Sequence, residues 1–384
     1  MKLAIVHDGL ATFGGRGGAE WVLTVLKDMF PDAPIYTTIY NPERMPDYFQ
    51  QFDIRPSFIQ KLPFGKTKYK AYLPFMPSAI EQFDLSCYDV VLSCNHAVAK
   101  GVITPPDTLH LCYCYTPLRY AWDMYHDYME TSWKGRIARL CIPPLLTYMR
   151  MWDSFASNRV DTFIAISHYV AQRIRKYYGR EAYVIYPPVD ISQFTPSAMV
   201  DPYFLVVSRL EPYKRIDLAV QAFNRLGLPL IVIGDGSERT KLMSIAKQNI
   251  TFLGRQSDDV VREHLARCQA LIFPGEEDFG ITPVEAQASG RPVIAYRGGG
   301  ALETVVAEKT GQFFYPKTVD ALVETVRQFD TGKFDSQAIH RHARKFDISV
   351  FRQHMLDTLI SSRTEYADPP RHRPYLSRDS QRRS

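Results

Sequence analysis

Short apolar runs alternate with amphipathic stretches along most of the chain, and this alternation predicts its secondary structure. In the first half, the runs at 3–7, 88–93, 109–114 and 161–167 are largely continuous, which is typical of parallel strands buried on both faces. Stretches with helical spacing of apolar residues separate them. Strands and helices in alternation predict an α/β domain.

The same pattern begins again after a proline-containing polar segment at 187–200. A chain of 384 residues is also long for one hydrophobic core. We therefore expect two Rossmann-like, doubly wound α/β domains at 1–186 and 201–345, with 187–200 as the linker. An amphipathic pattern predicts a helix at 346–363 that crosses back to the first domain. Residues 364–384 are rich in Pro, Arg and Ser, and we expect a disordered basic tail there.

Composition and charge argue against several classes of function. The net charge is only +5, so the chain lacks the basic excess of a dedicated nucleic-acid binder. It contains no run of about 18 apolar residues and passes from Met1 almost directly into a strand, so we expect a cytoplasmic protein. The six cysteines have no paired CxxC spacing, which predicts reduced thiols and no zinc.

One stretch, residues 273–300, holds two glutamates eight residues apart, Glu277 and Glu285. A buried strand is expected to end where the stretch begins, so that Glu277 lies in the following loop. A turn at Phe279 and Gly280 then leads into a helix that carries Glu285, and the helix N-terminus offers N–H donors and positive potential. Two carboxylates can thus face one small ligand. An ordinary strand, loop and helix with solvated acids accounts for the spacing equally well.

Glycines and cations at other strand ends are compatible with an anion site. The loop after the first strand ends in Gly17 and Gly18, where backbone can approach a phosphate, although a purely structural turn fits these glycines too. A complete dinucleotide-binding fingerprint is missing. Arg209 and Lys214 follow a strand of the second half, and two cations there suit a diphosphate. Gly234 repeats the glycine turn after the next strand.

Two segments of the first half mix basic and aromatic residues. Segment 55–80 contains four lysines among phenylalanines and tyrosines, and segment 133–152 contains three arginines around an apolar centre. Such surfaces suit an anionic membrane. A packed irregular helix whose lysines extend into solvent is the alternative.

Three polar side chains follow strands of the first half: Asp8, His96 and Tyr115. Residues just past the strands of a doubly wound sheet face the ligand crevice. These three are therefore candidates for contacts to an acceptor substrate, with a structural role as the alternative.

Together these residues resemble glycosyltransferase family 4, a large family of retaining enzymes with the two-domain GT-B fold. The resemblance covers about residues 1 to 360 and rests on short motifs in both halves. The motifs are Gly17-Gly18-Ala19-Glu20, Pro187-Pro188-Val189-Asp190, Ser208-Arg209 with Lys214, Gly234-Asp235-Gly236, Glu277-Asp278-Phe279-Gly280 with Glu285, and Glu303 behind Gly298 to Gly300. Segment 112–123, CYCYTPLRYAWD, is similar to mannosyltransferases of surface-polysaccharide assembly that use GDP-mannose.

The resemblance implies roles for these positions. Arg209 and Lys214 would hold the donor diphosphate while negative charge develops on it. Glu277 would face the donor sugar, and these three form the implied catalytic group. Glu285 would accept hydrogen bonds from the ribose hydroxyls. Further donor contacts would come from Gly17, Gly18, Gly234, Phe279, Gly280, Ile281 and Thr282. Neither a metal nor a cofactor is implied, because the two cations neutralise the diphosphate and the nucleotide sugar is a co-substrate.

The implied reaction transfers a hexose, namely mannose from GDP-mannose, to a lipid-linked or polysaccharide acceptor with retention of configuration. The donor phosphate would take the proton of the acceptor hydroxyl on the same face of the sugar. The implied partners are a nucleotide sugar, a lipid-linked or oligosaccharide acceptor and an anionic membrane surface, and not nucleic acid. A position on the inner face of the membrane would follow.

One residue departs from the family pattern. Tyr115 stands where many relatives carry histidine, and a tyrosine cannot act as a base at neutral pH. Two alternatives therefore stay open: a sugar-nucleotide epimerase or hydrolase on the same fold, and a catalytically silent protein that binds a sugar nucleotide.

Overall fold

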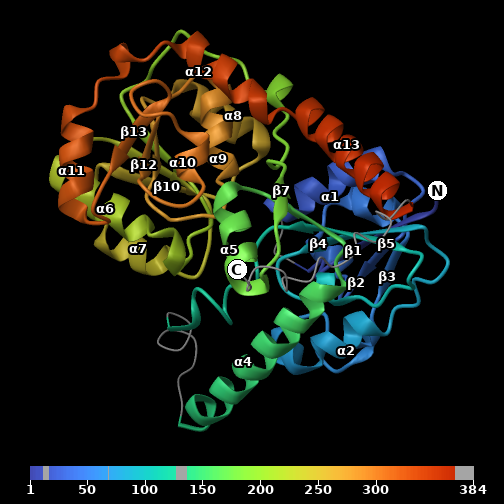
Figure 1. Ribbon diagram of the computed structural model, residues 1–384. Helices are drawn as coiled ribbons and strands as arrows, with labels where there is room; N and C mark the ends of the chain where they lie inside the picture. The colour runs from blue at the N-terminus through green and yellow to red at the C-terminus, as the bar shows by residue number, and fades with distance from the viewer. Residues whose placement is uncertain (12–16, 68, 127–135, 368–384) are drawn as a thin grey trace, which may run out of the picture.

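Two parallel sheets with helices packed on them form two domains (Figure 1). The computed structural model describes residues 1–11, 17–67, 69–126 and 136–367. The strand order is β3-β2-β1-β4-β5-β6-β7 in the first sheet and β10-β9-β8-β11-β12-β13 in the second. Neighbouring strands pair in parallel throughout both sheets. The expected fold class, two Rossmann-like α/β domains, is confirmed.

The strands of the first sheet are β1 (Leu3–His7), β2 (Ile35–Thr37), β3 (Ile54–Pro56), β4 (Val90–Asn95), β5 (Leu109–Cys114), β6 (Thr162–Ala165) and β7 (Ala182–Val184). Those of the second are β8 (Phe204–Val207), β9 (Leu230–Ile233), β10 (Ile250–Gly254), β11 (Leu271–Phe273), β12 (Val293–Tyr296) and β13 (Gly311–Phe314). Every residue of β1, β4 and β5 is buried. This explains their continuous apolar character, because helices cover a parallel sheet on both faces.

The helices of the first domain are α1 (Gly18–Met29), α2 (Met76–Glu81), α4 (Arg136–Ala156) and α5 (His168–Tyr178). Those that follow are α6 (Ile216–Leu226), α7 (Arg239–Ile245), α8 (Asp258–Arg267), α9 (Ile281–Ala288), α10 (Ala301–Thr304), α11 (Val319–Gln328), α12 (Ser336–Ala343) and α13 (Ile348–Ala367). Short 3-10 helices used below are η3 (Phe58–Lys61), η4 (Tyr69–Phe75), η5 (Ala99–Gly101) and η8 (Pro212–Lys214).

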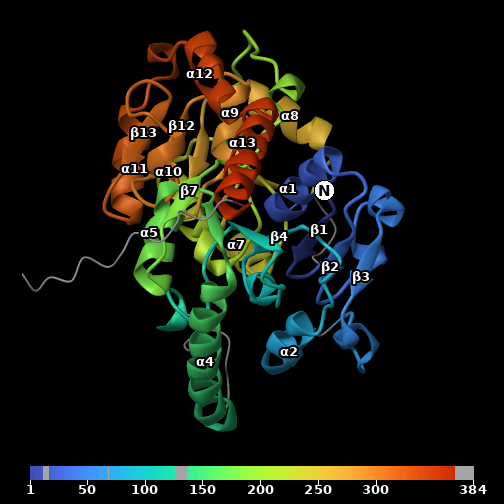
Figure 2. The ribbon, with the colours of Figure 1, turned by 45° about the vertical axis from the view of Figure 1, so that its right-hand side comes forward.

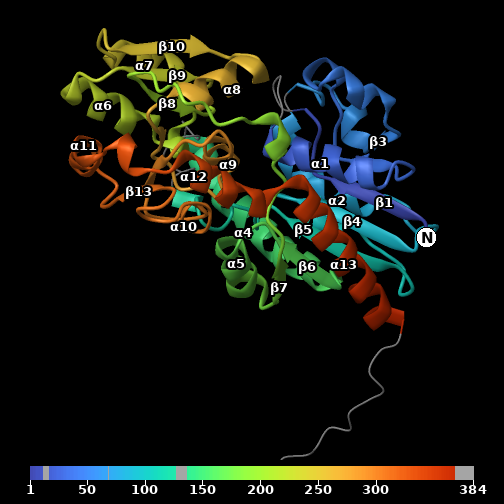
Figure 3. The ribbon, with the colours of Figure 1, turned by 90° about the horizontal axis from the view of Figure 1, so that it is seen from above.

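The chain returns to the first domain through α13, which lies against that domain (Figure 3). Its side chains Phe351, Met355 and Leu359 join the hydrophobic cluster of the first sheet. The Tyr366 hydroxyl donates to the carbonyl of Pro106 at 2.5 Å. Helix α13 ends at Ala367 and not at the expected residue 363, because this contact holds its last turn on the first domain. Residues 364–367 therefore belong to the helix and not to the tail. Residues 368–384, where disorder was expected, lie outside the described residues.

Helix α4 projects from the first domain beside α2 (Figures 1 and 2). Its buried side chains Ile142, Leu146 and Met149 share a hydrophobic cluster with Met76 and Ile80 of α2. Segment 55–80 folds as β3, η3, η4 and α2, and several of its aromatic residues pack on the same cluster. Among the helices of the described chain, none is both long and apolar enough to cross a membrane.

Candidate functional site

The loop between β11 and α9 contains the acidic run of the sequence and ends in a constrained turn. Gly280 has φ of +91°, and a Cβ atom there would lie 3.1 Å from the ring of Phe273, so glycine is strongly favoured. Helix α9 has no side-chain cap at its N-terminus. Within the described chain, the N–H groups of Gly280 and Ile281 meet no acceptor. These donors and the helix dipole are available to a ligand.

Lys214 and Glu277, which are 63 residues apart in their numbering, form an ion pair in the second domain. Lys214 Nζ lies 2.6 Å from Glu277 Oε2, and the two side chains are only 13% and 19% exposed. Arg209 lies on the same turn as Lys214 and is exposed. Its Nη2 donates to the Tyr213 hydroxyl at 3.0 Å. Two cations and one carboxylate thus border this turn.

A second glycine turn packs against the end of β8. A Cβ atom on Gly234 would lie only 1.8 Å from the carbonyl oxygen of Ser208. The backbone of Gly234 itself has φ of +135°. Glycine is therefore required for this close approach, which brings the β9 turn next to the turn that carries Arg209.

Glu285 occupies a different environment from Glu277, one turn into α9. Burial raises its pKa to about 7, and the nearby carboxylate of Asp258 adds to the shift while Arg262 opposes it. Both neighbours lie on α8. Thr282 lies three residues before Glu285, in the first turn of α9. A carboxylate that holds a proton near neutral pH suits hydrogen bonding to hydroxyl groups.

The first domain meets this region through the N-terminus of α1. A Cβ atom on Gly18 would lie 2.8 Å from Ile281 Cδ1 in α9. Gly17 is the N-cap residue of α1, which has no side-chain cap. The N-termini of α1 and α9 therefore lie close together across the two domains. The rest of this glycine loop, residues 14–16, lies outside the described residues.

Asp8 and His96 form a pair at the ends of β1 and β4. The Asp8 carboxylate accepts from the backbone N–H groups of residues 96–99 at 2.5 to 2.9 Å, and His96 Nδ1 lies 3.1 Å from Asp8 Oδ2. Burial alone would raise the pKa of Asp8, but His96 and these N–H groups lower it. Asp8 is buried whereas the His96 side chain is 45% exposed. Asp8 thus positions His96, and of these two side chains His96 is the exposed one.

Tyr115 and His7 complete a ring cluster with His96. The three ring centroids lie 6.0 to 6.4 Å apart. The Tyr115 hydroxyl donates to the carbonyl of Ala19 in α1 at 3.1 Å, and burial raises its pKa well above the ordinary value. Burial also lowers the pKa of His7 to about 4, with His96 adding to the shift. His7 was missed in the sequence because it lies inside an apolar strand.

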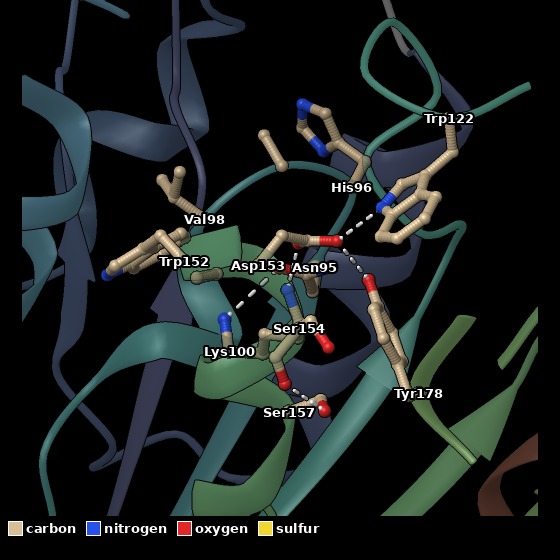
Figure 4. A network of polar contacts seen from close by, with 12 residues as sticks. Asn95, His96, Val98, Lys100, Trp122, Trp152, Asp153, Ser154, Ser157 and Tyr178 are labelled. Carbon is tan, nitrogen blue, oxygen red and sulfur yellow. Dashed lines mark hydrogen bonds and ion pairs between the residues drawn. The ribbon is translucent and has the colours of Figure 1, made fainter. Parts of the chain in front are cut away.

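A buried ion pair supports the loop that carries His96 (Figure 4). Lys100 Nζ contacts Asp153 Oδ1, and both side chains are fully buried. The other oxygen of Asp153 accepts from Trp122 Nε1 and the Tyr178 hydroxyl, each at 2.8 Å. One carboxylate thereby joins η5, α4, α5 and the loop after β5.

Several charged residues at the domain boundary had no role in the sequence analysis: Arg119, Asp123, Arg173, Glu276, Asp278 and Glu303. Arg119 and Arg173 pair with Asp278 across the two domains, and Arg173 also pairs with Asp123 within the first domain. Glu276 accepts from the Tyr169 hydroxyl and Glu303 from the N–H of His168, both across the domains. Arg119, Asp123, Asp278 and Glu303 stand inside motifs quoted above, so a signal was present. The pattern gave no means to pair a residue of one domain with a residue of the other.

Two family models match consecutive parts of the chain. Residues 16–193 match Glycosyltransferase Family 4, and residues 190–346 match Glycosyl transferases group 1. Together the two matches span nearly all of both domains.

Curated relatives are similar over about half of the chain. An uncharacterized glycosyltransferase of Methanocaldococcus jannaschii is 30% identical over 51% of this chain and 57% of its own length. O-antigen chain mannosyltransferase C of Escherichia coli is 25% identical over 56% of this chain and 63% of its own length. A GDP-mannose-dependent alpha-(1-6)-phosphatidylinositol monomannoside mannosyltransferase of Mycobacterium tuberculosis is 27% identical over 54% and 61%. Less than two thirds of each relative is matched.

Solved structures resemble the whole fold. The structure of Anabaena HepE in complex with UDP superposes on 94% of this chain over 100% of its own length, with a TM-score of 0.69 and 18% identity. Sucrose-phosphate synthase of Thermosynechococcus elongatus superposes on 94% of this chain over 99% of its own length, with a TM-score of 0.72 and 16% identity. At these identities the likeness concerns the fold. With both halves matched by the family models, the chain belongs to glycosyltransferase family 4 and has the GT-B fold.

Proposed function

We propose that the protein transfers a hexose from a nucleotide sugar to an acceptor with retention of configuration. The observation that carries the proposal is the Lys214–Glu277 pair, 2.6 Å apart, beside the uncapped N-terminus of α9. A cation for phosphate on η8 thus contacts the β11–α9 loop, which offers a carboxylate for sugar hydroxyls and free N–H donors. This combination fits a nucleotide sugar better than it fits a phosphate alone or a sugar alone.

In this proposal the chain acts mainly by charge and orientation. Lys214 and Arg209 stabilise the charge that develops on the departing diphosphate. Glu277 accepts from the sugar hydroxyls, and the N–H groups at Phe279 to Ile281 donate to them. Glu285 accepts from the ribose hydroxyls. No metal or further cofactor is required, because fixed cations already neutralise the leaving group.

Mannose from GDP-mannose is the donor that we propose. Two relatives named as mannosyltransferases support it, one of them GDP-mannose-dependent. The UDP in the HepE structure makes a uridine donor the main competitor. The proposed acceptor, a lipid-linked or polysaccharide chain, would enter on the side of His96.

A surface of the first domain supports a lipid-linked acceptor at an anionic membrane. We define the α4 stripe as the large apolar residues Leu140, Tyr148, Met151 and Phe155, which are 47% to 77% exposed. Their spacing of eight, three and four places them on one helix face. All exposed side chains described on α4 are uncharged.

Segment 55–80, which packs on the same hydrophobic cluster as α4, adds exposed aromatic and basic residues. Phe64 and Phe75 are 71% and 54% exposed, and Lys61 and Lys66 in the same segment are exposed as well. Apolar groups that enter the interface, together with lysines that attract anionic headgroups, favour a peripheral position on such a membrane.

A transfer assay tests the proposed function. Wild-type protein, Lys214→Ala and Glu285→Ala are incubated with GDP-mannose and lipid-linked acceptor, and released GDP and the product anomer are measured. We expect loss of transfer in both variants and an α-linked product from the wild type. Asp320→Asn, in an exposed ion pair of α11, serves as the control and should be unchanged. Wild-type turnover in both site variants would refute the site assignment.

A further inference from the structure

Adjacent acids of the β11–α9 loop have partners in different domains. Glu277 pairs with Lys214 of its own domain. Asp278 instead reaches the first domain, where Arg173 Nη1 of α5 lies 2.5 Å from its Oδ1 and Arg119 Nη1 lies 3.4 Å from its Oδ2. The sugar-facing loop is thus held from both domains.

The contact continues as a chain of four alternating charges. Arg173 Nε also lies 3.0 Å from Asp123 Oδ2, so the order is Arg119, Asp278, Arg173, Asp123. We call these four residues the charge bridge. Their side chains are 11% to 23% exposed, so water and salt screen the bridge less than a surface pair.

The backbone of the same loop is fixed by the N-terminus of α5. The Ser167 hydroxyl donates to the carbonyl oxygen of Asp278 at 2.6 Å, while its oxygen accepts from the N–H of Val170. Glu303 of the second domain accepts from the N–H groups of His168 and Tyr169 at 2.8 and 2.9 Å. The N-terminus of α5 in the first domain therefore donates hydrogen bonds to two residues of the second domain, Asp278 and Glu303.

We propose that Asp278 and Arg173 are positioning residues that complete the donor-sugar site only when the two domains are together. Asp278 stands between Glu277 and the N–H groups at Phe279 to Ile281, so fixing it fixes both sets of sugar contacts. Neither residue touches the reacting atoms in this scheme. The bridge also gives segment 112–123 a role, because Arg119 and Asp123 come from it. The inference rests on the proposed function.

Steady-state kinetics and nucleotide binding test the inference in the full chain. For Asp278→Asn and Arg173→Met we expect kcat to fall on the order of 100-fold, because a misplaced sugar loses the reactive geometry. The Kd for GDP should stay within about twofold, since the proposed nucleotide contacts lie elsewhere. Arg173→Lys keeps the charge but not the planar fork, so it should recover part of the activity. Asp320→Asn is again the matched control.

Solution scattering supplies a readout that does not depend on turnover. With GDP bound, we expect the radius of gyration of Asp278→Asn to exceed that of the wild type, and thermal unfolding shows whether each variant is folded. Wild-type kinetics and wild-type scattering in Asp278→Asn would overturn the inference. A GDP affinity that falls as much as kcat would do so too. If the wild type transfers no sugar, the proposed function fails, and the scattering comparison still decides whether the bridge holds the domains.

Discussion

Glu285 and Tyr115 show how single side chains at this site are set by burial. Each has its pKa raised chiefly by loss of water, but the consequences differ. Glu285 titrates near neutral pH, whereas Tyr115 stays protonated and bonds to Ala19. The sequence identified both positions. It could not give their protonation, because that depends on neighbours such as Asp258 that are distant along the chain.

Glu285 should make stability depend on pH. Its pKa is raised from 4.5 to about 7 in the folded state, so the folded protein binds a proton that the unfolded chain releases. Stability is then greatest below pH 4.5 for this group and falls by about 3 kcal/mol as the pH rises through 7. Urea unfolding of the wild type and Glu285→Gln at pH 4.5 and 8 measures this. The difference between them should change with pH, and a constant difference would contradict the assignment.

Tyr115→Phe separates a structural hydroxyl from a catalytic one. The substitution removes the bond to the Ala19 carbonyl and should lower the free energy of unfolding by about 1 kcal/mol. Transfer should stay within a few-fold of the wild type, because a neutral buried hydroxyl is no base. Denaturant unfolding and kcat measure the two effects. A complete loss of transfer with unchanged stability would show that the hydroxyl takes part in the chemistry.

At the scale of elements, the sequence located the buried strands well because they depend on local spacing. Ser167, the last residue of the apolar run 161–167, is the N-cap residue of α5, and its Oγ accepts from the Val170 N–H at 3.0 Å. Helix α1 begins at Gly18, directly after the glycine loop, with Gly17 as its N-cap residue. The buried Lys100–Asp153 pair was not found, since nothing in either local pattern marks a partner 53 residues away.

Asp153→Asn tests that ion pair. It leaves the buried charge of Lys100 without its anion and should lower the free energy of unfolding by about 3–5 kcal/mol. Asn still accepts from Trp122 and Tyr178. The double variant Lys100→Met, Asp153→Asn should therefore recover much of the loss, as measured by denaturant unfolding. A double variant as unstable as the single one would refute the charge-pair explanation.

The α4 stripe predicts binding to anionic vesicles. In cosedimentation, the wild type should bind vesicles rich in phosphatidylglycerol and bind phosphatidylcholine vesicles weakly. Met151→Glu with Phe155→Glu should reduce that binding, because charge replaces the inserting groups. Met243→Glu, at a 49% exposed position of α7, is the control. Equal binding by all three proteins would exclude the stripe, and self-association through it would appear as a dimer in light scattering.

At the scale of the whole molecule, two domains were predictable because the alternation of strands and helices restarts after residue 200 and each half can fill a core. The motif residues also fell at strand ends, as a parallel sheet requires. The sequence could not show which charged residues of the two domains pair with each other. Arg173 lies 105 residues from Asp278, and only the folded arrangement brings them together.

Calorimetric titration of nucleotide sugars into the wild type and Lys214→Ala tests the central claim most directly, namely that the β11–α9 loop and Lys214 hold a nucleotide sugar. We expect GDP-mannose to bind the wild type, and the variant to bind at least about tenfold more weakly, because a charged contact to the diphosphate is lost. UDP-glucose should bind more weakly than GDP-mannose. Tighter binding of UDP-glucose would contradict the proposed donor, and equal affinity of wild type and variant for GDP-mannose would contradict the site.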